Sequence, residues 1–186
     1  MKKTQYLTVV IFFLAAVALI SFTSVKDNAA SIKKASSIAD WERAKAYTLE
    51  YLSAANDEVI SFKPTPEIRS FGQQMLHIAE ANYGFGSAAA AKKNPISFGD
   101  LEKASDKYKT KEALTQAVMD SYDFIIAAMK ELDEAKMDEK FTMFNRFEMS
   151  REAGFEKAFE HQTHHRGQTT VYLRLNGIAP PNEKLF

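Results

Sequence analysis

Histidines are scarce in this 186-residue chain, and three of the four lie close together between His161 and His165. The fourth, His77, lies more than eighty positions earlier. Two histidines at positions i and i+4 of a helix direct their imidazoles to one point, as in the helical half of many zinc sites. No cysteine is present, so thiolate ligands are excluded. The pattern indicates a divalent metal bound by imidazoles (Zn, Ni, Fe or Cu), and spacing alone does not select the metal.

Helical phase separates the clustered histidines into two that converge and one at the side. An α-helix turns about 100° per residue, so His165 lies about 40° from His161, whereas His164 lies about 60° to the other side. His161 and His165 share the face that carries the apolar residues of this helix. His77 lies on a strip of small residues of an earlier helix, consisting of Ala81, Gly84 and Ala88. His77 is therefore a candidate third ligand, and three protein ligands leave positions for water or substrate.

The alternative is that these histidines bind no metal and are either solvated or packed in the core. An isolated pair at this spacing is usually one of the two. Burial of three imidazoles without partners is costly, however. This cost favours a metal site with His77, His161 and His165 as its ligands.

Three further residues are candidates for supporting this site. Gln168 lies one turn beyond His165, where it would orient a ligand imidazole or a metal-bound water, or simply bond to a neighbouring helix. Glu80 lies three residues after His77 and is either an acid/base group beside the metal or, as we favour, part of a solvated helix face. Tyr172 is expected to pack in the core, with a contact of its hydroxyl to the site as the alternative.

Four long helical patterns must position these residues. The first is expected to begin near Ser37 and to end before Phe62, and the second to begin at Thr65-Pro66 and to end about Lys92. Thr110 is expected to cap the third, and the fourth to run from near Ser150 to Asn176, with Gly177 as a left-handed C-terminal cap. The segment 92–110 between the second and third is expected to be a loop with one short helical turn. These patterns predict an all-α fold, a four-helix bundle.

Two features do not follow the helical patterns. Residues 136–149 contain Phe141, Phe144 and Phe147, which indicate a loop packed on the body, or alternatively a roof over an apolar substrate pocket. No strand-like alternation of useful length is found. Gly167 lies in mid-helix, where glycine costs about 1 kcal/mol relative to alanine, so close helix packing is expected there.

The N-terminal segment differs in composition from the rest of the chain. Residues 1–30 combine a basic head, the uncharged run from Leu7 to Ile20 and a small-residue exit, which predicts a secretory signal peptide and leader. The alternative is an uncleaved membrane anchor, because about 20 residues without a charge can span a bilayer. Residues 31–37 are expected to be a flexible linker, and residues 38–186 the folded domain. The domain is therefore expected to be exported, periplasmic or extracellular, and to contact a membrane only through an uncleaved anchor.

The charge balance excludes one class of partner. The chain has 24 basic and 24 acidic residues, and residues 1–30 contain three of the former and one of the latter. The remaining chain therefore has a net charge of −2 and no basic cluster. Nucleic-acid binding normally needs such a cluster to neutralise phosphates, so no nucleic-acid partner is expected.

The segment 161–168 (HQTHHRGQ), with its exit through Leu175 and Gly177 to Pro180-Pro181, resembles the end of the DinB-like family. Members typically carry His-x-x-His-His-Arg-Gly-Gln followed by Leu-x-Gly-x-x-Pro-Pro. The stretch 69–78, which ends just after His77, is similar to an earlier part of the family, and the resemblance covers about residues 38–186. It implies a four-helix bundle with one divalent metal bound by His77, His161 and His165, and His164 turned aside. Relatives often form dimers, so a homodimer is an alternative to a monomer, and the residues themselves do not decide between the two.

The resemblance places thiol-dependent transferases and isomerases of small molecules among the relatives. The export signal departs from those relatives, which work in the reducing cytoplasm. We therefore expect an exported protein that binds Zn, Ni or Fe and acts as a metal-dependent hydrolase or small-molecule group transferase. The alternatives are a non-catalytic metal- or ligand-binding protein of the cell envelope and an interaction module with packed histidines.

Overall fold

The computed structural model describes residues 31–186, and the expected signal peptide or anchor lies outside the described part. Ile38–Phe186 form a compact unit of their own. Residues 31–54 are helical throughout, so the expectations of a flexible linker at 31–37 and of a helix start near Ser37 are both wrong. The segment contains lysine and alanine, which favour helix, and neither glycine nor proline. None of the helices in this described part is long and apolar enough to cross a membrane.

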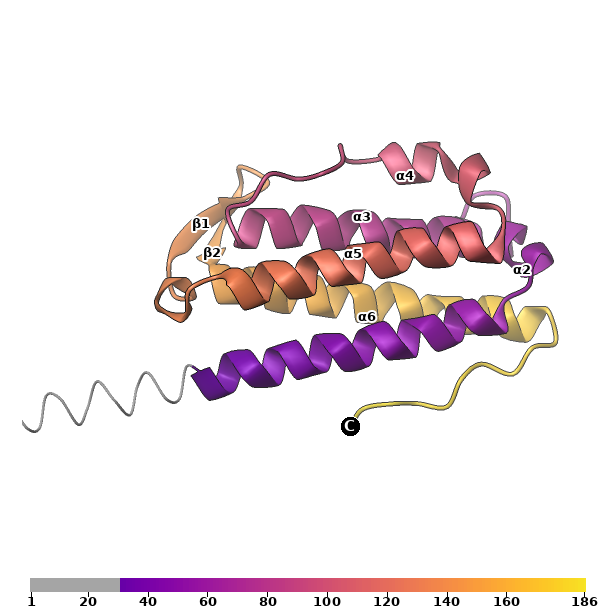
Figure 1. Cartoon of the computed structure of the whole chain (residues 1–186). Helices are drawn as coiled ribbons and strands as arrows, with labels where there is room; N and C mark the ends of the chain where they lie inside the picture. Colours follow the sequence, from indigo (N-terminus) through magenta and orange to yellow (C-terminus); the bar gives the residue numbers. More distant parts are fainter. Residues whose placement is uncertain (1–30) are drawn as a thin grey trace, which may run out of the picture. The chain divides into compact units, whose positions relative to one another are not determined.

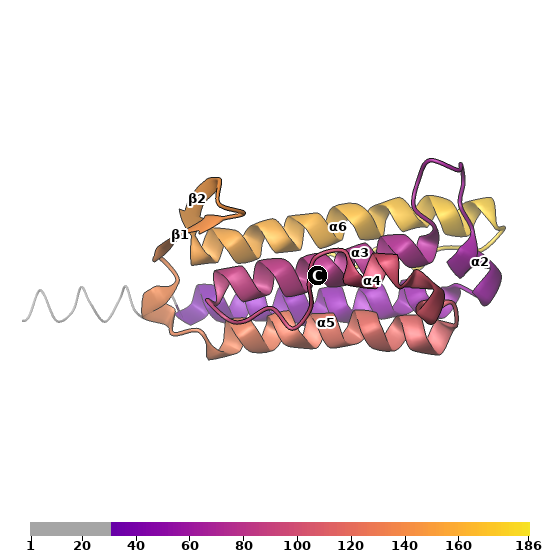
Figure 2. The same ribbon diagram turned by 90° about the horizontal axis from the view of Figure 1, so that it is seen from above.

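Four long helices contribute to the compact unit: residues 38–54 of the first helix, α3 (Phe71–Ala89), α5 (Lys111–Glu131) and α6 (Arg151–Leu175). Figures 1 and 2 show these helices running alongside one another. Helix α3 packs against both α5 and α6. The first of the four packs against the same two helices through hydroxyl pairs: Thr48 with Tyr122, and Tyr51 with Thr170, each at 2.8 Å. The predominantly helical fold predicted from periodicity is therefore confirmed.

The interior combines large apolar side chains with buried hydrogen-bonded polar groups. Trp41 is fully buried, and its ring meets those of Tyr122 and Phe159 edge-on. The Tyr122 hydroxyl donates to Gln162 Oε1, which also accepts a hydrogen bond from Arg166 Nη1 at 2.7 Å. Burial raises the pKa of Tyr122 to about 12, so its hydroxyl remains a donor at every physiological pH.

Helix starts follow their capping residues, with one error in the prediction. Thr110 and Ser150 cap α5 and α6, as expected. Helix α3 begins at Phe71 and not at Thr65-Pro66, because Ser70 and Gln73 form a reciprocal capping box. It ends at Ala89, before the predicted Lys92. Gly177 has φ +71°, which agrees with the left-handed conformation expected after α6.

The connections contain more regular structure than the sequence indicates. The first helix ends at residue 54 and not just before Phe62, and α2 (Asp57–Ser61) is a separate helix capped by Asn56. The connection between α3 and α5 contains α4 (Asp100–Lys103) and the 3-10 helix η1 (Ser105–Tyr108) where one helical turn was expected. A further 3-10 turn, η2 (Glu134–Lys136), follows α5.

A β-hairpin occupies the segment for which no strand was expected. It consists of β1 (Lys140–Met143) and β2 (Phe147–Ser150), paired antiparallel with Met143 opposite Phe147. Strands of four residues are too short to give a clear alternation in the sequence. The hairpin lies beside the first turns of α6 (Figure 2).

Two glycines of α6 have opposite environments. A Cβ atom on Gly154 would lie 2.9 Å from the Phe141 ring and 3.1 Å from Ala89 Cβ, so the absence of a side chain lets the hairpin approach the bundle. Gly167 is exposed, and a Cβ there would meet nothing within 4 Å. The expectation of close helix packing at Gly167 is therefore wrong.

We expect Gly167→Ala to raise the free energy of unfolding by about 1 kcal/mol, because alanine removes backbone entropy from the unfolded chain and creates no clash. Gly154→Ala is the matched substitution in the same helix and should lower stability by about 1 kcal/mol or more through overpacking. Urea denaturation of both variants measures the two changes. Equal effects at the two positions would contradict this assignment.

Candidate metal centre

Three histidines converge between α3 and α6. His77 extends from α3, and His161 and His165 extend from successive turns of α6. Their ring centroids lie 5.0 Å apart for His77–His161, 4.5 Å for His77–His165 and 4.4 Å for His161–His165. One ring nitrogen of each lies within 4.8 Å of the others. The structure thus brings together the three histidines that helical phase selected, and their nitrogens are close enough to share one ion.

Hydrogen bonds on the outer side orient two of the three rings. His77 Nδ1 lies 2.7 Å from Glu102 Oε1, and His165 Nδ1 lies 3.0 Å from Gln74 Oε1. Both oxygens accept hydrogen bonds, so Nδ1 of each ring is the donor and Nε2 is the nitrogen left for a metal. Metal-bound histidines in proteins usually have such an outer acceptor.

The third ring has a nitrogen without a hydrogen-bond partner. His161 Nδ1 is buried and bonds to no protein group. An unpartnered buried polar atom costs free energy. A ligand to the imidazole would remove such a cost, so the donor set fits a divalent metal that prefers nitrogen ligands.

The electrostatic surroundings keep the α6 histidines in the ligating form. Burial, followed by the neighbouring histidines, lowers the pKa of His161 to about 4 and that of His165 to about 3. Both rings are therefore neutral at pH 7, as metal ligation requires. Burial would raise the pKa of Glu102, but hydrogen bonds from His77 and Arg69 lower it to about 2, so this carboxylate is ionised.

Glu80 is buried, so the favoured expectation of a solvated helix face is wrong. Only 1% of Glu80 is exposed. Its carboxylate accepts hydrogen bonds from the backbone N–H groups of Gly99, Leu101 and Glu102, at 3.0, 2.6 and 2.9 Å. Glu80 therefore fixes the start of α4, the element that carries Glu102.

Gln168 and Tyr172 bond to residues that neighbour the three-histidine cluster and not to the three histidines themselves. Gln168 Oε1 accepts a hydrogen bond from Gln74 Nε2 at 2.7 Å, so Gln168 orients the amide that contacts His165. Its own amide nitrogen lies 2.8 Å from Nε2 of His164, which is exposed and turned aside. The Tyr172 hydroxyl donates to the Arg69 carbonyl oxygen, and the ring is buried, so Tyr172 contributes to packing.

Sequence reasoning missed three residues of this arrangement. Glu102 lies in the connection between helices, where a carboxylate gives no signal of its own. Arg69, 2.6 Å from Glu102 Oε2 through Nε, precedes α3. Gln74 lies one turn before His77 on the same helix, and this spacing is the signal that would have identified it.

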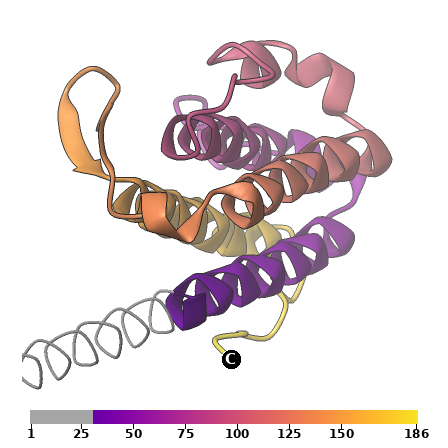
Figure 3. The same cartoon turned by 60° about the vertical axis from the view of Figure 1, so that its left-hand side comes forward.

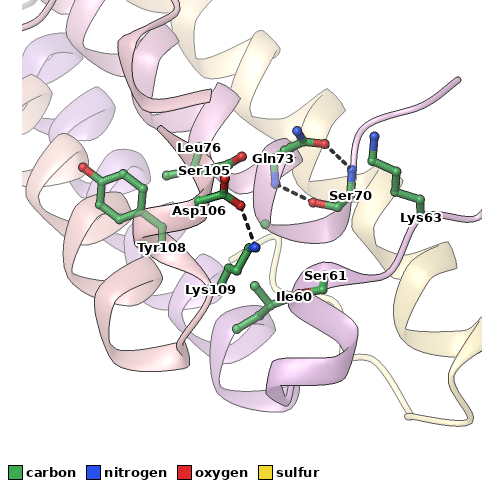
Figure 4. A pocket seen from close by; sticks show the side chains of 11 residues that line it. Ile60, Ser61, Lys63, Ser70, Gln73, Leu76, Ser105, Asp106, Tyr108 and Lys109 are labelled. Carbon is green, nitrogen blue, oxygen red and sulfur yellow. Dashed lines mark hydrogen bonds and ion pairs between the residues drawn. The ribbon is translucent and has the colours of Figure 1, made fainter. Parts of the chain in front are cut away.

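A separate cavity of about 260 Å³, lined by both polar and apolar residues, lies between the start of α3, α2 and η1. Figure 4 shows its lining, which includes the Ser70–Gln73 capping box and the ion pair between Asp106 and Lys109 at 2.6 Å. These groups bind one another, and none of the four histidines lines the cavity. The histidine cluster is therefore the better candidate for chemistry.

Residues 40–169 match the family model of the DinB superfamily, which is more than half of the chain. The chain therefore belongs to the DinB superfamily. The crystal structure of a DinB-like protein from Bacillus cereus is similar, with a TM-score of 0.65 and 20% identity over 80% of this chain and 95% of that one. No curated protein matches the chain.

Two further crystal structures have the same fold. A DinB-like protein from Bacillus subtilis has a TM-score of 0.61 and 20% identity, over 81% of this chain and 96% of that one. A conserved protein from Enterococcus faecalis has a TM-score of 0.55 and 17% identity, over 75% of this chain and 94% of that one. At these identities the likeness shows the fold, and the family resemblance expected from the histidine motif is confirmed by the family match.

We expect the metal-free protein to lose stability as the pH falls from about 6.5 towards 4 and 3. The unfolded chain binds protons at His161 and His165 near the ordinary histidine pKa of about 6.5, whereas the folded chain binds them only near the lowered values. The unfolded state therefore gains protons first on acidification. Urea denaturation at stepwise pH measures the slope, and His161→Gln should make it shallower. An unchanged slope in this variant, with exposed His164→Gln as control, would contradict the assignment.

Proposed function

We propose that the chain binds one divalent metal ion through His77, His161 and His165, with Zn, Ni and Fe as the candidate ions. The observation that carries the proposal is the convergence of three imidazoles from two helices, two of them already bonded through Nδ1 to Glu102 and Gln74. Because these two bonds engage Nδ1 and leave Nε2 for the metal, little reorganisation is needed on binding. With no cysteine in the chain, the set is an all-nitrogen one.

Three protein ligands leave coordination positions for a small molecule. The metal when bound supplies Lewis-acid chemistry, which supports hydrolysis or group transfer. The chain itself contributes orientation: Glu102 and Gln74 fix two rings, and Arg69 keeps the Glu102 carboxylate in place. We infer a metal-dependent hydrolase or small-molecule group transferase as the first candidate function.

A specific observation favours a second candidate, a non-catalytic metal- or ligand-binding protein. Both carboxylates beside His77 are engaged: Glu80 accepts three backbone hydrogen bonds, and Glu102 bonds to His77 and Arg69. Neither is free to move a proton to or from a substrate. Turnover of esters, amides and thiol acceptors by the metal-loaded protein, with His161→Ala as control, separates the two candidates.

We propose further that the domain works outside the cytoplasm, in the periplasm or the extracellular space. The support is the sequence of residues 1–30, with its basic head and the apolar run from Leu7 to Ile20. An uncleaved anchor is the alternative form of the same proposal. Fractionation of cells that express the full chain, followed by mass determination of the mature N-terminus, tests both.

Protein purified without a histidine tag should contain about one equivalent of metal by elemental analysis. His77→Ala and His165→Ala should lose it, because each removes one of only three ligands. His164→Ala is the matched control: this ring neighbours His165 at 4.9 Å but is exposed, and metal content should be unchanged. Absence of metal affinity at neutral pH in the unsubstituted protein would overturn the proposal.

Glu102→Gln should weaken metal binding by roughly 10- to 100-fold, because an outer carboxylate raises the basicity of the imidazole that it contacts. Competition with a metal chelator measures the affinity. Glu131→Gln is the matched control, since it removes an ion pair with Lys92 elsewhere in the bundle. Equal affinities of the Glu102 variant and the unsubstituted protein would show that this hydrogen bond does not act on the metal.

A further inference from the structure

An apolar pocket of about 610 Å³ opens between the β-hairpin and α6. Figure 3 shows the hairpin standing out beside the first turns of α6. The volume is in the range of pockets that bind small molecules, roughly 300–1,000 Å³. The residues that line it include two of the four histidines: Phe85, Met143, Phe144, Phe147, Glu148, Met149, Lys157, Glu160, His161 and His164.

The hairpin covers this pocket with an apolar face that the bundle only partly buries. Directly opposed residues of an antiparallel pair point to the same side, so Phe141, Met143, Phe147 and Met149 share one face. Phe141 and Met143 anchor this face: Phe141 packs on Gly154, and Met143 is 1% exposed. Phe147, by contrast, is 50% exposed. One half of the face therefore holds the hairpin in place, and the other half projects over the pocket.

The turn of the hairpin carries a residue that folding does not explain. Phe144 and Asn145 both have positive φ, +53° and +54°, within a turn closed by the hydrogen bond from Arg146 N to Met143 O. Such turns favour glycine and asparagine, and a bulky residue with positive φ is an outlier. Phe144 is also 62% exposed, so burial does not repay this cost. An outlier of this kind is a reason to look for a functional role.

The pocket is continuous with the histidine cluster through two ring contacts. The Phe85 ring lies 5.6 Å from that of Phe144 and 5.8 Å from that of His161, between centroids. His161 belongs both to the pocket lining and to the three-histidine group. A molecule with its apolar body against the phenylalanines would therefore have its other end beside His161, one of the three proposed ligands.

The charged groups of the lining are paired with opposite charges. Lys157 bonds to Glu160 at 2.7 Å, and Glu148 bonds to Lys140 at 2.9 Å. The pocket therefore presents little net charge to an incoming molecule. Its lining suits an uncharged apolar body.

We propose that this pocket binds the aromatic or aliphatic body of a small molecule whose polar end coordinates the metal at the three histidines. Coordination of the polar end depends on the proposed function of the three histidines. Binding of the apolar body is argued independently, from the hairpin and Phe85 alone. A small molecule is favoured over a protein surface because the pocket has a volume in the range of small-molecule sites and is lined by three phenylalanines together with His161.

Calorimetric titration of the zinc-loaded protein compares benzohydroxamate with acetohydroxamate, which share the metal-binding end and differ in the ring. Benzohydroxamate should bind at least about tenfold more tightly, because the phenyl ring is removed from water. Phe144→Asn should abolish this preference and leave acetohydroxamate affinity unchanged. Thermal melting should show that the variant is as stable as the unsubstituted protein or more so, since asparagine suits the positive φ. Phe98→Ala, which removes another exposed ring, should change neither ligand's affinity.

A preference for benzohydroxamate that persists in Phe144→Asn, or equal affinities in the unsubstituted protein, would overturn the proposal. Sedimentation provides a further test. A dimeric unsubstituted protein and a monomeric Phe144→Asn variant would also overturn the proposal, because Phe144 would then contact a second copy of the chain and not a small molecule. Failure of the metal site is distinguishable, since neither hydroxamate would bind. The pocket is then tested in metal-free protein with the dye 1-anilinonaphthalene-8-sulfonate. The fluorescence of the dye should rise when the unsubstituted protein is added, and this rise should be smaller with Phe144→Asn. An equal rise with both proteins would overturn the pocket.

Discussion

The carboxylate of Glu80 accepts three backbone hydrogen bonds from the start of α4, and the histidine cluster depends on this contact. A buried carboxylate is stable only where such donors replace water. Here the donors belong to the connection between α3 and α5, so the same contact fixes that connection against α3. Glu102 is thereby placed beside His77, which precedes Glu80 by three residues on α3. One buried acid thus orients a metal-ligand candidate through Glu102.

Helix α6 carries polar groups toward two sides of the bundle at once. His161 and His165 face α3, whereas Gln162 and Arg166, the next residue in each case, face the buried Tyr122. The Arg166 guanidinium also lies 4.5 Å from the Tyr47 ring centroid. Because Gln162 bonds to Tyr122, Arg166 contacts Tyr47 and the two histidines face α3, these contacts together specify the rotation of α6 about its axis.

The two halves of the hairpin differ in their contacts with the bundle: one half is packed on α6, and the other half is exposed. Its anchored half needs Gly154, because only a residue without Cβ lets Phe141 approach α6. Its projecting half exposes aromatic side chains and places Phe144 at a positive φ. A segment selected for stability alone would bury these rings or replace them with polar residues. Phe144 and Phe147 line the same pocket as His161, and this position is the basis of the proposed ligand site.

Local sequence was sufficient for the helices, for the caps at Thr110 and Ser150, and for the common face of His161 and His165, because these follow from neighbours within one or two helical turns. It misplaced the start of α3, since two adjacent segments carry capping signals and only packing selects between them. The burial of Glu80, the contact of Glu102 with His77 and the apolar pocket under the hairpin were decided by the tertiary structure. Their partners lie on different elements, 25 residues apart for His77 and Glu102, and no periodic pattern connects them. Periodicity determines which face a side chain occupies, but only the packed chain determines what it meets there.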